Sequence, residues 1–191
     1  MADADTRFLD LGFQYYTAGR LAFLTQLTPI TGNLFHHAIE MQIKARLSQT
    51  HTLEELGRKP FGHRLFSLWD AFKAEFSDEE LDEFDSVISL LDEFEELRYP
   101  DSILKNGASV MLQITAPVTA HLSNLGSIAV PEYTLVLNDI DRLFARILQV
   151  SSRNPLFFIS PLNEFGCSAL SQDNPVAEFL LKGGNKASTA S

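Results

Sequence analysis

Two histidines and a glutamate lie close together in the sequence, at His36, His37 and Glu40. On a helix, residues three and four positions apart share a face, so these three side chains would meet. Imidazole and carboxylate groups bind divalent metals such as zinc, but such sites usually take a fourth donor or a second ligand pair from another element. The sequence offers no such second motif. We therefore interpret the three residues as structural contacts and predict neither a metal nor a cofactor.

Motifs for other chemistry are absent from the sequence. It contains no Gly-rich phosphate loop, Cys-x-x-Cys pair, Ser-centred elbow or DNA-reading motif. Cys167 is the one cysteine, and no nearby histidine in the sequence could activate it as a nucleophile. A lone cysteine fits a reducing compartment, and the acidic start of the chain does not look like a secretion signal. We expect a cytoplasmic protein that binds neither membrane nor DNA.

Charge is concentrated in one segment of the 191-residue chain. Residues 75–96 contain eleven acids and no Lys or Arg, whereas the whole chain has a formal net charge of −10. The remaining residues therefore carry −10 minus −11, a net charge of +1. Contacts with phosphates depend on Lys and Arg, so any nucleic-acid site must lie outside this segment. The run itself is typical of a solvated helix face.

Helical periodicity dominates the first half of the chain. Apolar residues at three- and four-residue steps predict a helix over 8–27, which Pro29 ends, and a second helix over 31–48. The short turn between them predicts antiparallel packing. The inward faces are expected to consist of Phe8, Leu11, Tyr15, Ala18, Ala22 and Leu27 in the first helix, and of Leu34, Ala38, Met41 and Ala45 in the second.

Three further helices follow a connector over 50–62. We predict a third helix over 65–76, a fourth helix with Ser77 as its N-cap and Pro100 at its end, and a fifth capped by Asn138 and ending near Ser152. The expected inward faces are Leu65, Leu68, Trp69, Phe72 and Phe76; Leu81, Phe84, Ile88, Leu91 and Phe94; and Ile140, Leu143, Phe144, Ile147 and Leu148.

The second half also contains segments that are not helical in pattern. Residues 109–115 and 132–137 are short and β-like, and we predict that they pair as a hairpin packed on the helices. The apolar segment 154–162 should dock as an irregular or extended strap, and the tail over 182–191 should be disordered. The predicted fold is mainly α: an up-and-down four- to five-helix bundle with a small β-like insertion at about 105–137, in one domain over 1–181.

Three short segments, taken in order, resemble the landmarks of one family. They are GNLFHHAIEMQIKARL (32–47), GHRLFSLW (62–69) and ELRYPDS (96–102). They resemble HEPN domains, helical modules found beside or fused to minimal nucleotidyltransferases. The resemblance covers residues 7 to about 150, with the β-like piece as an insertion. It implies a helical bundle, the same architecture that the periodicity predicts.

The resemblance also implies a function. We expect a non-catalytic HEPN-like module that binds a nucleotide, RNA or a protein partner through residues 58–64 and the groove between the second and third helices. The partner would be a nucleotidyltransferase or another protein, as in a toxin–antitoxin pair. The residues expected to contact a ligand are His37, Glu40, Lys44 and Arg98. A homodimer is also expected, because the apolar segments exceed what five helices need to bury.

An enzymatic alternative comes from the same resemblance. Many members of the family are metal-independent ribonucleases marked by an Arg, four to six residues, and a His. Arg58 with His63 has this spacing, and so has Arg46 with His51. The family's pair lies on the last core helix, whereas here Arg98 is followed by no nearby His. The alternative function is therefore a ribonuclease with Arg58 and His63 as catalytic residues.

The residues between Arg58 and His63 bear on that alternative. Pro60 has no backbone N–H and biases Lys59 toward extended geometry, so Arg58 should lie off the helix that follows His63. We predict that the two residues do not form a catalytic dyad. His63 should instead cap the third helix or brace its start against the second.

Overall fold

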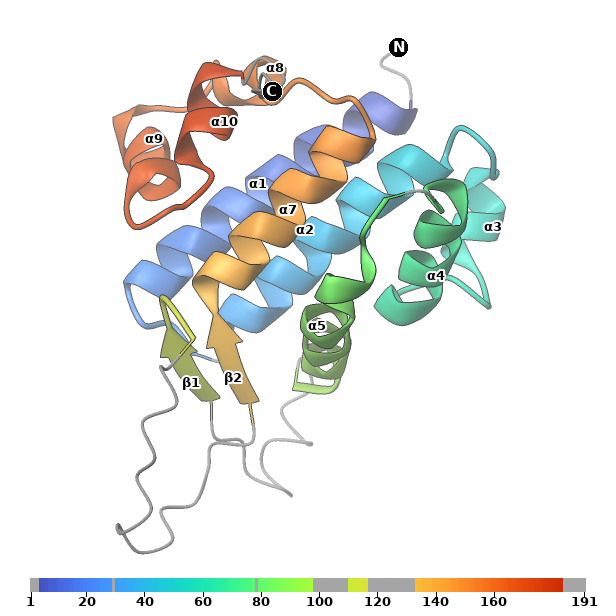
Figure 1. Cartoon of the computed structure of the whole chain (residues 1–191), viewed down its shortest axis with the longest axis horizontal. Helices are drawn as coiled ribbons and strands as arrows, with labels where there is room; N and C mark the ends of the chain where they lie inside the picture. Colours follow the sequence, from blue (N-terminus) through green and yellow to red (C-terminus); the bar gives the residue numbers. More distant parts are fainter. Residues whose placement is uncertain (1–3, 29, 78, 98–109, 117–132, 184–191) are drawn as a thin grey trace, which may run out of the picture.

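The computed structural model describes residues 4–28, 30–77, 79–97, 110–116 and 133–183. Within these ranges the chain is mainly helical and has one two-stranded sheet (Figure 1), which confirms the predicted helical bundle with a small β insertion. In chain order the elements are α1 (Ala4–Leu24), α2 (Ile30–Leu47), α3 (Leu53–Gly57), α4 (Leu65–Glu75), η1 (Asp82–Phe84), α5 (Asp85–Leu97), β1 (Val110–Gln113), β2 (Tyr133–Val136), α7 (Leu137–Val150), α8 (Leu156–Ile159), α9 (Glu164–Ser171) and α10 (Ala177–Lys182). None of the helices in the described ranges is both long and apolar enough to cross a membrane.

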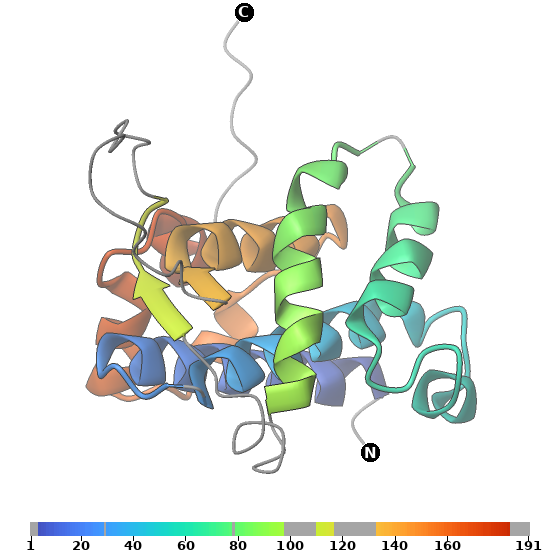
Figure 2. The ribbon, with the colours of Figure 1, turned by 90° about the horizontal axis from the view of Figure 1, so that it is seen from below.

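Helices α1, α2 and α7 lie side by side and form the centre of the molecule (Figure 1). Helices α3, α4 and α5 lie on one side of this layer and α8–α10 on the other, while α5 runs across the direction of α1 and α2 (Figure 2). Close approach of the helices depends on small residues. A Cβ at Gly32 would lie 2.2 Å from Phe94 Cδ1 on α5, and one at Gly19 would lie 2.8 Å from Phe35 Cε1 on α2.

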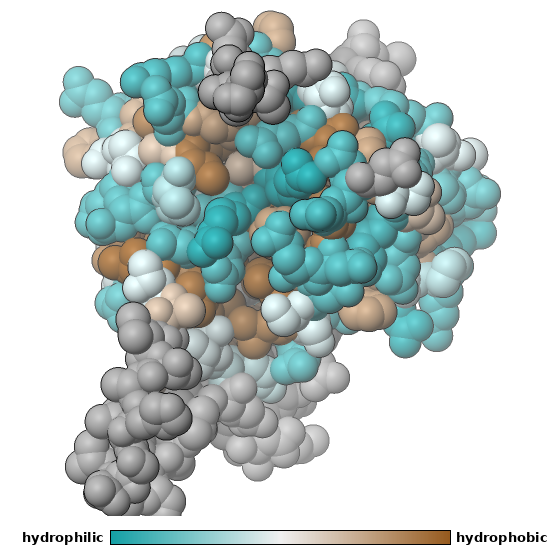
Figure 3. All heavy atoms as spheres, viewed as in Figure 1, coloured by the Kyte–Doolittle hydropathy of each residue, from teal (hydrophilic) through white to brown (hydrophobic). Residues whose placement is uncertain are grey.

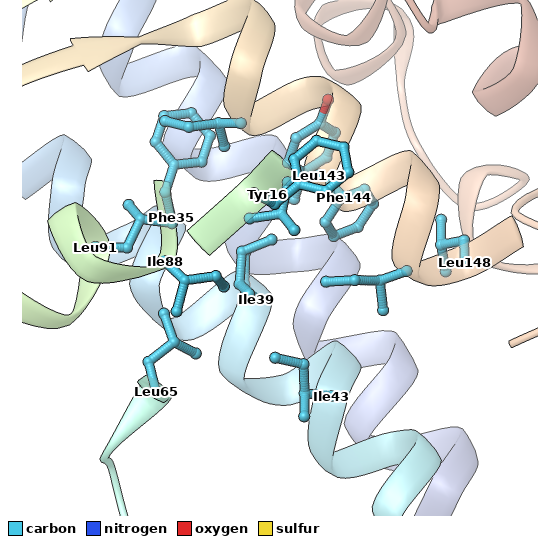
Figure 4. Packing of buried hydrophobic residues seen from close by; sticks show 14 of the residues in the cluster. Tyr16, Phe35, Ile39, Ile43, Leu65, Ile88, Leu91, Leu143, Phe144 and Leu148 are labelled. Atoms are coloured by element: carbon cyan, nitrogen blue, oxygen red, sulfur yellow. The ribbon is translucent and has the colours of Figure 1, made fainter. Parts of the chain in front are cut away.

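One hydrophobic core joins the central helices, as Figure 4 shows. Tyr16 of α1 stacks on Phe144 of α7 with ring centroids 3.9 Å apart. Helix α2 contributes Phe35, Ile39 and Ile43, all without exposed surface. The outer surface is different in character: the face in Figure 3 is mostly hydrophilic, with smaller hydrophobic areas between.

A buried ion pair fixes α1 against α7 and the C-terminal helices. Arg20 and Asp141 contact one another, and neither side chain has exposed surface. Arg20 Nε also donates to the Ala169 carbonyl of α9 at 2.7 Å. Burial raises the pKa of Tyr16, so its hydroxyl stays protonated and donates to Asp141 Oδ1 at 2.6 Å. The pair thus has hydrogen-bond partners on three elements, as a buried charge requires.

The inward faces of α4, α5 and α7 are confirmed, whereas of the face predicted for the first helix only Ala22 is buried. Leu68 of α4, Ile88 of α5 and Phe144 of α7 are buried as predicted. In α1, however, Leu11 is 43% exposed, and Leu27, which follows the helix, is 55% exposed. The buried residues of α1 include Leu9, Phe13, Tyr16, Arg20 and Phe23. This face also includes Gly12 and Gly19. The charged Arg20 and the two glycines interrupt the apolar stripe, so the sequence does not reveal which face of α1 is buried.

The predicted caps at Ser77 and Asn138 are wrong. Trp69 Nε1 donates to Asp85 Oδ1 at 2.7 Å, and Asp85 begins α5 directly after the 3₁₀ turn η1, eight residues beyond Ser77. Strand β2 runs without a loop into α7, so Val136 is the N-cap and Asn138 lies inside the helix. Where a strand leads straight into a helix, its extended last residue replaces a side-chain cap.

The predicted hairpin is also wrong, because β1 and β2 pair in parallel, with Val110 opposite Tyr133. A parallel pair needs a connection of about a dozen residues or more, and residues 114–132 supply enough chain. The backbone N–H of Asn138 donates to the Ile114 carbonyl at 3.0 Å, which anchors the end of this pair to the start of α7.

Short helices replace the irregular segments expected in two places. The connector over 50–62 contains α3, which Thr52 and Glu55 close with a capping box. The expected strap over 154–162 contains α8, with Ile159 buried but Phe157 78% exposed, and α9 follows it. Helices of four to eight residues leave too few turns for an apolar period to be read. Residues 184–191 of the expected tail lie outside the described ranges.

The contact between Gly32 and Phe94 generates a prediction. Gly32→Ala should lower the free energy of unfolding by about 1–3 kcal/mol, because the added methyl overlaps a fully buried ring at the α2–α5 crossing. Urea unfolding followed by circular dichroism measures the change. The matched control is Gly57→Ala, since a Cβ at Gly57 meets no atom within 4 Å. Equal loss in both variants would contradict the role of this crossing.

Candidate functional site

Glu40 lies at the centre of a polar cluster, although its side chain has no exposed surface. Its Oε1 contacts Lys44 Nζ at 2.6 Å and His63 Nδ1 at 3.1 Å. Its Oε2 contacts His37 Nδ1 at 3.2 Å and His36 Nε2 at 3.6 Å. We call these five residues the Glu40 cluster. One carboxylate therefore collects the polar groups of two segments far apart in the sequence.

Two elements position these side chains. Helix α2 brings together the four members it carries, because His36, His37 and Lys44 stand three or four residues from Glu40. His63 comes from the residues just before α4. The backbone N–H of Leu65, the first residue of α4, donates to Asp92 Oδ1 of α5 at 2.6 Å. Asp92 therefore caps α4, and His63 braces this end against α2 as predicted.

The carboxyl group of Glu40 stays ionised. Burial by itself would raise the pKa of Glu40, but the nearby imidazole of His36 and the hydrogen bonds from His37 and Lys44 outweigh burial and hold that pKa well below its usual range. An ionised carboxylate can only accept hydrogen bonds. A nitrogen that hydrogen-bonds to Glu40 must therefore carry a proton, which makes Nδ1 of His37 and of His63 the donor. In the neutral form of either ring, Nε2 then keeps its lone pair.

His36 is held differently. Its Nδ1 lies 2.9 Å from the Leu91 carbonyl, so Nδ1 must donate there. Its Nε2 is buried and has no hydrogen-bond partner among the described residues. Burial lowers the pKa of His36, but the nearby Glu40 carboxylate and the Leu91 carbonyl raise it further, so that the net shift is upward. The surroundings of His36 therefore favour its protonated form more than water does.

The cluster opens toward solvent on one side. His36 and Glu40 are fully buried, His37 is 19% exposed and His63 is 60% exposed. Tyr15 of α1 covers His37, with ring centroids 5.3 Å apart. A ligand from solvent therefore reaches the two outer imidazoles first. Oriented imidazoles of this kind can accept or donate protons or bind a cation.

The structure brings some predicted site residues together and separates others. His37, Glu40 and Lys44 meet in the cluster, whereas Arg98 lies outside the described ranges. Arg58 is 74% exposed and pairs with Glu54 at 2.5 Å, while His63 pairs with Glu40. Arg46 and His51, the second pair with the Arg-to-His spacing of the ribonucleases, have separate partners too. Arg46 binds Glu75 at 2.7 Å and His51 contacts Thr50.

Sequence reasoning missed two features of the cluster. It named Glu40 and Lys44 as residues that contact a ligand but did not predict that both are buried. It predicted that His63 braces the start of α4 against α2, but it did not identify Glu40 as the partner, because this contact spans 23 positions and depends on how α4 packs. The available signal was Glu40 itself, an acid between apolar residues of a helix that other helices surround.

Removing the charge of Glu40 should destabilise the protein. Glu40→Gln should lower the free energy of unfolding by about 3–5 kcal/mol, because it leaves the buried Lys44 ammonium without its counterion. Chemical unfolding of both proteins at neutral pH checks this value. The control Glu54→Gln breaks the exposed pair with Arg58 and should cost less than about 1 kcal/mol. Similar losses in the two variants would mean that Glu40 is not a structural centre.

No protein-family model, curated protein or solved structure matches the chain. Inferences about its function therefore come from the geometry of its own residues.

Proposed function

We propose that the chain is a non-catalytic HEPN-like module that binds a nucleotide through the loop over residues 58–64. The observation that carries the proposal is the charge of this loop. It contains Arg58, Lys59 and Arg64 and no acid, and all three cations are exposed. His63, at the edge of the Glu40 cluster, lies in the same loop. A phosphate-bearing ligand is the natural partner of such a group of donors.

The surroundings of the loop support an anionic ligand. Lys59 and Arg64 make no ion pair with any residue of the described ranges, and Arg58 shares only the exposed Glu54. Behind the loop, Lys44 neutralises Glu40, so the cluster adds no uncompensated negative charge. Several acids near α4 and α5 already have partners: Asp85 binds Lys73, and Asp92 caps α4. The basic loop thus keeps its positive potential although the chain as a whole is acidic.

One observation favours the ribonuclease as a second candidate. The Nδ1–H of His63 faces a buried carboxylate, which is how a general acid or base is commonly oriented. Arg58, the other half of the candidate pair, is engaged by Glu54 instead. A phosphate held by both residues would need Arg58 to leave Glu54. For this reason the binding function ranks above the enzymatic one.

Nucleotide titrations in EDTA test the binding function. ATP should bind more tightly than adenosine, because the phosphates supply the anionic contacts. The triple variant Arg58→Ala/Lys59→Ala/Arg64→Ala should lower ATP affinity at least about tenfold, since each charge-assisted hydrogen bond contributes about 1.5–3 kcal/mol. Isothermal titration calorimetry measures both effects. Arg142→Ala removes an exposed arginine from α7 and should leave the affinity unchanged.

The same samples separate the two candidates. If adenosine binds as well as ATP, or the triple variant binds ATP normally, the loop is not a phosphate site. Incubation with RNA in EDTA tests cleavage directly. Turnover by the parent protein that His63→Ala abolishes would replace the binding function with the ribonuclease, whereas intact RNA supports the binding function.

We also propose that the module acts in the cytoplasm as a homodimer. The support is the exposure of large apolar side chains on the C-terminal helices, where Phe157 is 78% and Phe165 79% exposed. Apolar surface of this kind is typical of interfaces. Sedimentation should give twice the mass of one chain, and Phe157→Ser/Phe165→Ser should shift the protein toward single chains. A monomer at tens of micromolar, or a dimer unaffected by both changes, would contradict this interface.

A further inference from the structure

The contact between His36 and Glu40 poses a chemical problem. The Nδ1–H of His36 donates to the Leu91 carbonyl, so in the neutral ring Nε2 carries a lone pair. This atom has no hydrogen-bond partner among the described residues, is buried, and faces Glu40 Oε2 at 3.6 Å. The two atoms are of the kind that bind metal ions, and one ion could bridge them. Without metal a proton on Nε2 satisfies the contact, and a bound ion would replace that proton.

We infer that His36, His37 and Glu40 form a binding site for a divalent transition-metal ion, for which Zn²⁺ is the best match, with His63 at the fourth position. The inference goes beyond the proposed nucleotide binding and does not depend on it. Two imidazoles and one carboxylate are an established donor set for zinc, and three protein ligands leave one position open. Imidazole-rich sites prefer such metals over Mg²⁺ or Ca²⁺.

The distances agree with tetrahedral coordination. Zinc binds histidine nitrogen and carboxylate oxygen at about 2.0–2.2 Å, which places neighbouring donors of a tetrahedron about 3.3 Å apart. Oε2 of Glu40 lies 3.2 Å from His37 Nδ1 and 3.6 Å from His36 Nε2. The ligand atoms of all three residues lie within 4.8 Å of one another. Little movement would therefore be needed to enclose an ion, and the ion would displace the Nδ1 proton that His37 shares with Glu40, which leaves to solvent.

His63 offers the fourth protein donor that the three residues on α2 lack. A metal site on α2 alone has no fourth protein donor, and the fold brings His63 Nδ1 to 3.3 Å from Glu40 Oε2. Among the described residues only His36, His37 and Glu40 have donors that all lie within 4.8 Å of one another, so the exposed His63 ring would have to turn to complete the site. The ring centroids of His63 and His37 are 6.3 Å apart. Because His63 is 60% exposed, this side of the cluster also offers an entry path from solvent.

Neighbouring groups orient the donors as in known metal sites. The Leu91 carbonyl fixes the ring of His36 so that Nε2 faces the cluster, a common arrangement for metal-binding histidines. Lys44 binds Oε1 of Glu40 and leaves Oε2 for the ion. The Lys44 ammonium opposes a second cation nearby, so it should weaken metal binding. A gain in Zn²⁺ affinity when the Lys44 ammonium is removed would therefore distinguish a metal site from a purely structural network.

Metal titration tests the site directly. The EDTA-stripped and dialysed protein should bind one equivalent of Zn²⁺ per chain in competition with a chromophoric chelator, and Co²⁺ should give the visible absorption of a tetrahedral ion. His37→Ala should lower Zn²⁺ affinity at least about tenfold. His51→Ala is the control, because His51 contacts Thr50 and Phe61 instead of Glu40. Absence of stoichiometric Zn²⁺ binding, or equal affinity in parent and His37→Ala, would overturn the inference.

Two further variants sharpen the result. His63→Ala should also weaken Zn²⁺ binding, and unchanged affinity would overturn the assignment of His63 to the fourth position. Lys44→Met should be less stable without metal, and Zn²⁺ should restore its stability and bind it more tightly than the parent, as thermal unfolding and titration measure. A loss of stability that Zn²⁺ does not restore would mean that Glu40 serves Lys44 alone. The helical circular dichroism of each variant confirms that it is folded.

Discussion

An ionised carboxylate without contact to water dictates much of this structure. Burying a charge costs several kcal/mol unless partners compensate it, and Glu40 has the four partners that this cost demands. These partners are not confined to α2. His36 extends the network to the Leu91 carbonyl of α5, and His63 extends it to the start of α4. The charge on Glu40 therefore specifies how α2, α4 and α5 are placed relative to one another, whereas their apolar contacts alone are non-directional.

A second buried charge, that of Arg20, also needs partners to compensate its burial, on the other side of the bundle. Arg20 and Asp141 pair without exposed surface between α1 and α7, and Arg20 has donors left over for the Ala169 carbonyl of α9. An arginine has five N–H donors, so burial of its guanidinium favours several acceptors at once. This explains why α9 docks on α1 although it is only eight residues long. Helix α9 is thus held both by its apolar core residue Leu170 and by the buried guanidinium that its carbonyl helps to satisfy.

These buried charges also explain what the sequence could and could not predict. The faces of α4, α5 and α7 follow from their apolar periods, because nearly all their polar residues lie toward solvent or at helix ends, and the buried Asp141 of α7 does not interrupt the apolar stripe. Apolar spacing predicts the buried face less well in α1 and α2, because Arg20 of α1 and Glu40 and Lys44 of α2 are buried although they are charged. Conversely, Leu11 of α1 is exposed although it fits the predicted apolar stripe. Local spacing predicts that His36, His37 and Glu40 meet, since helix geometry is local. It cannot predict that His63 reaches Glu40, because the position of His63 depends on Asp92, which caps α4 from another helix.

His63 links the two regions of the molecule for which we propose ligand binding. It belongs to the basic loop over 58–64 and to the Glu40 cluster at once, and its contact with Glu40 holds that loop against α2. On these proposals, a ligand that draws the loop outward weakens this contact, while a cation held by His63 and Glu40 strengthens it. Coupling between two sites is reciprocal, so each binding event would alter the free energy of the other by the same amount. The two proposed sites would therefore be coupled through His63, because the imidazole that contacts the buried carboxylate belongs to the loop that faces solvent.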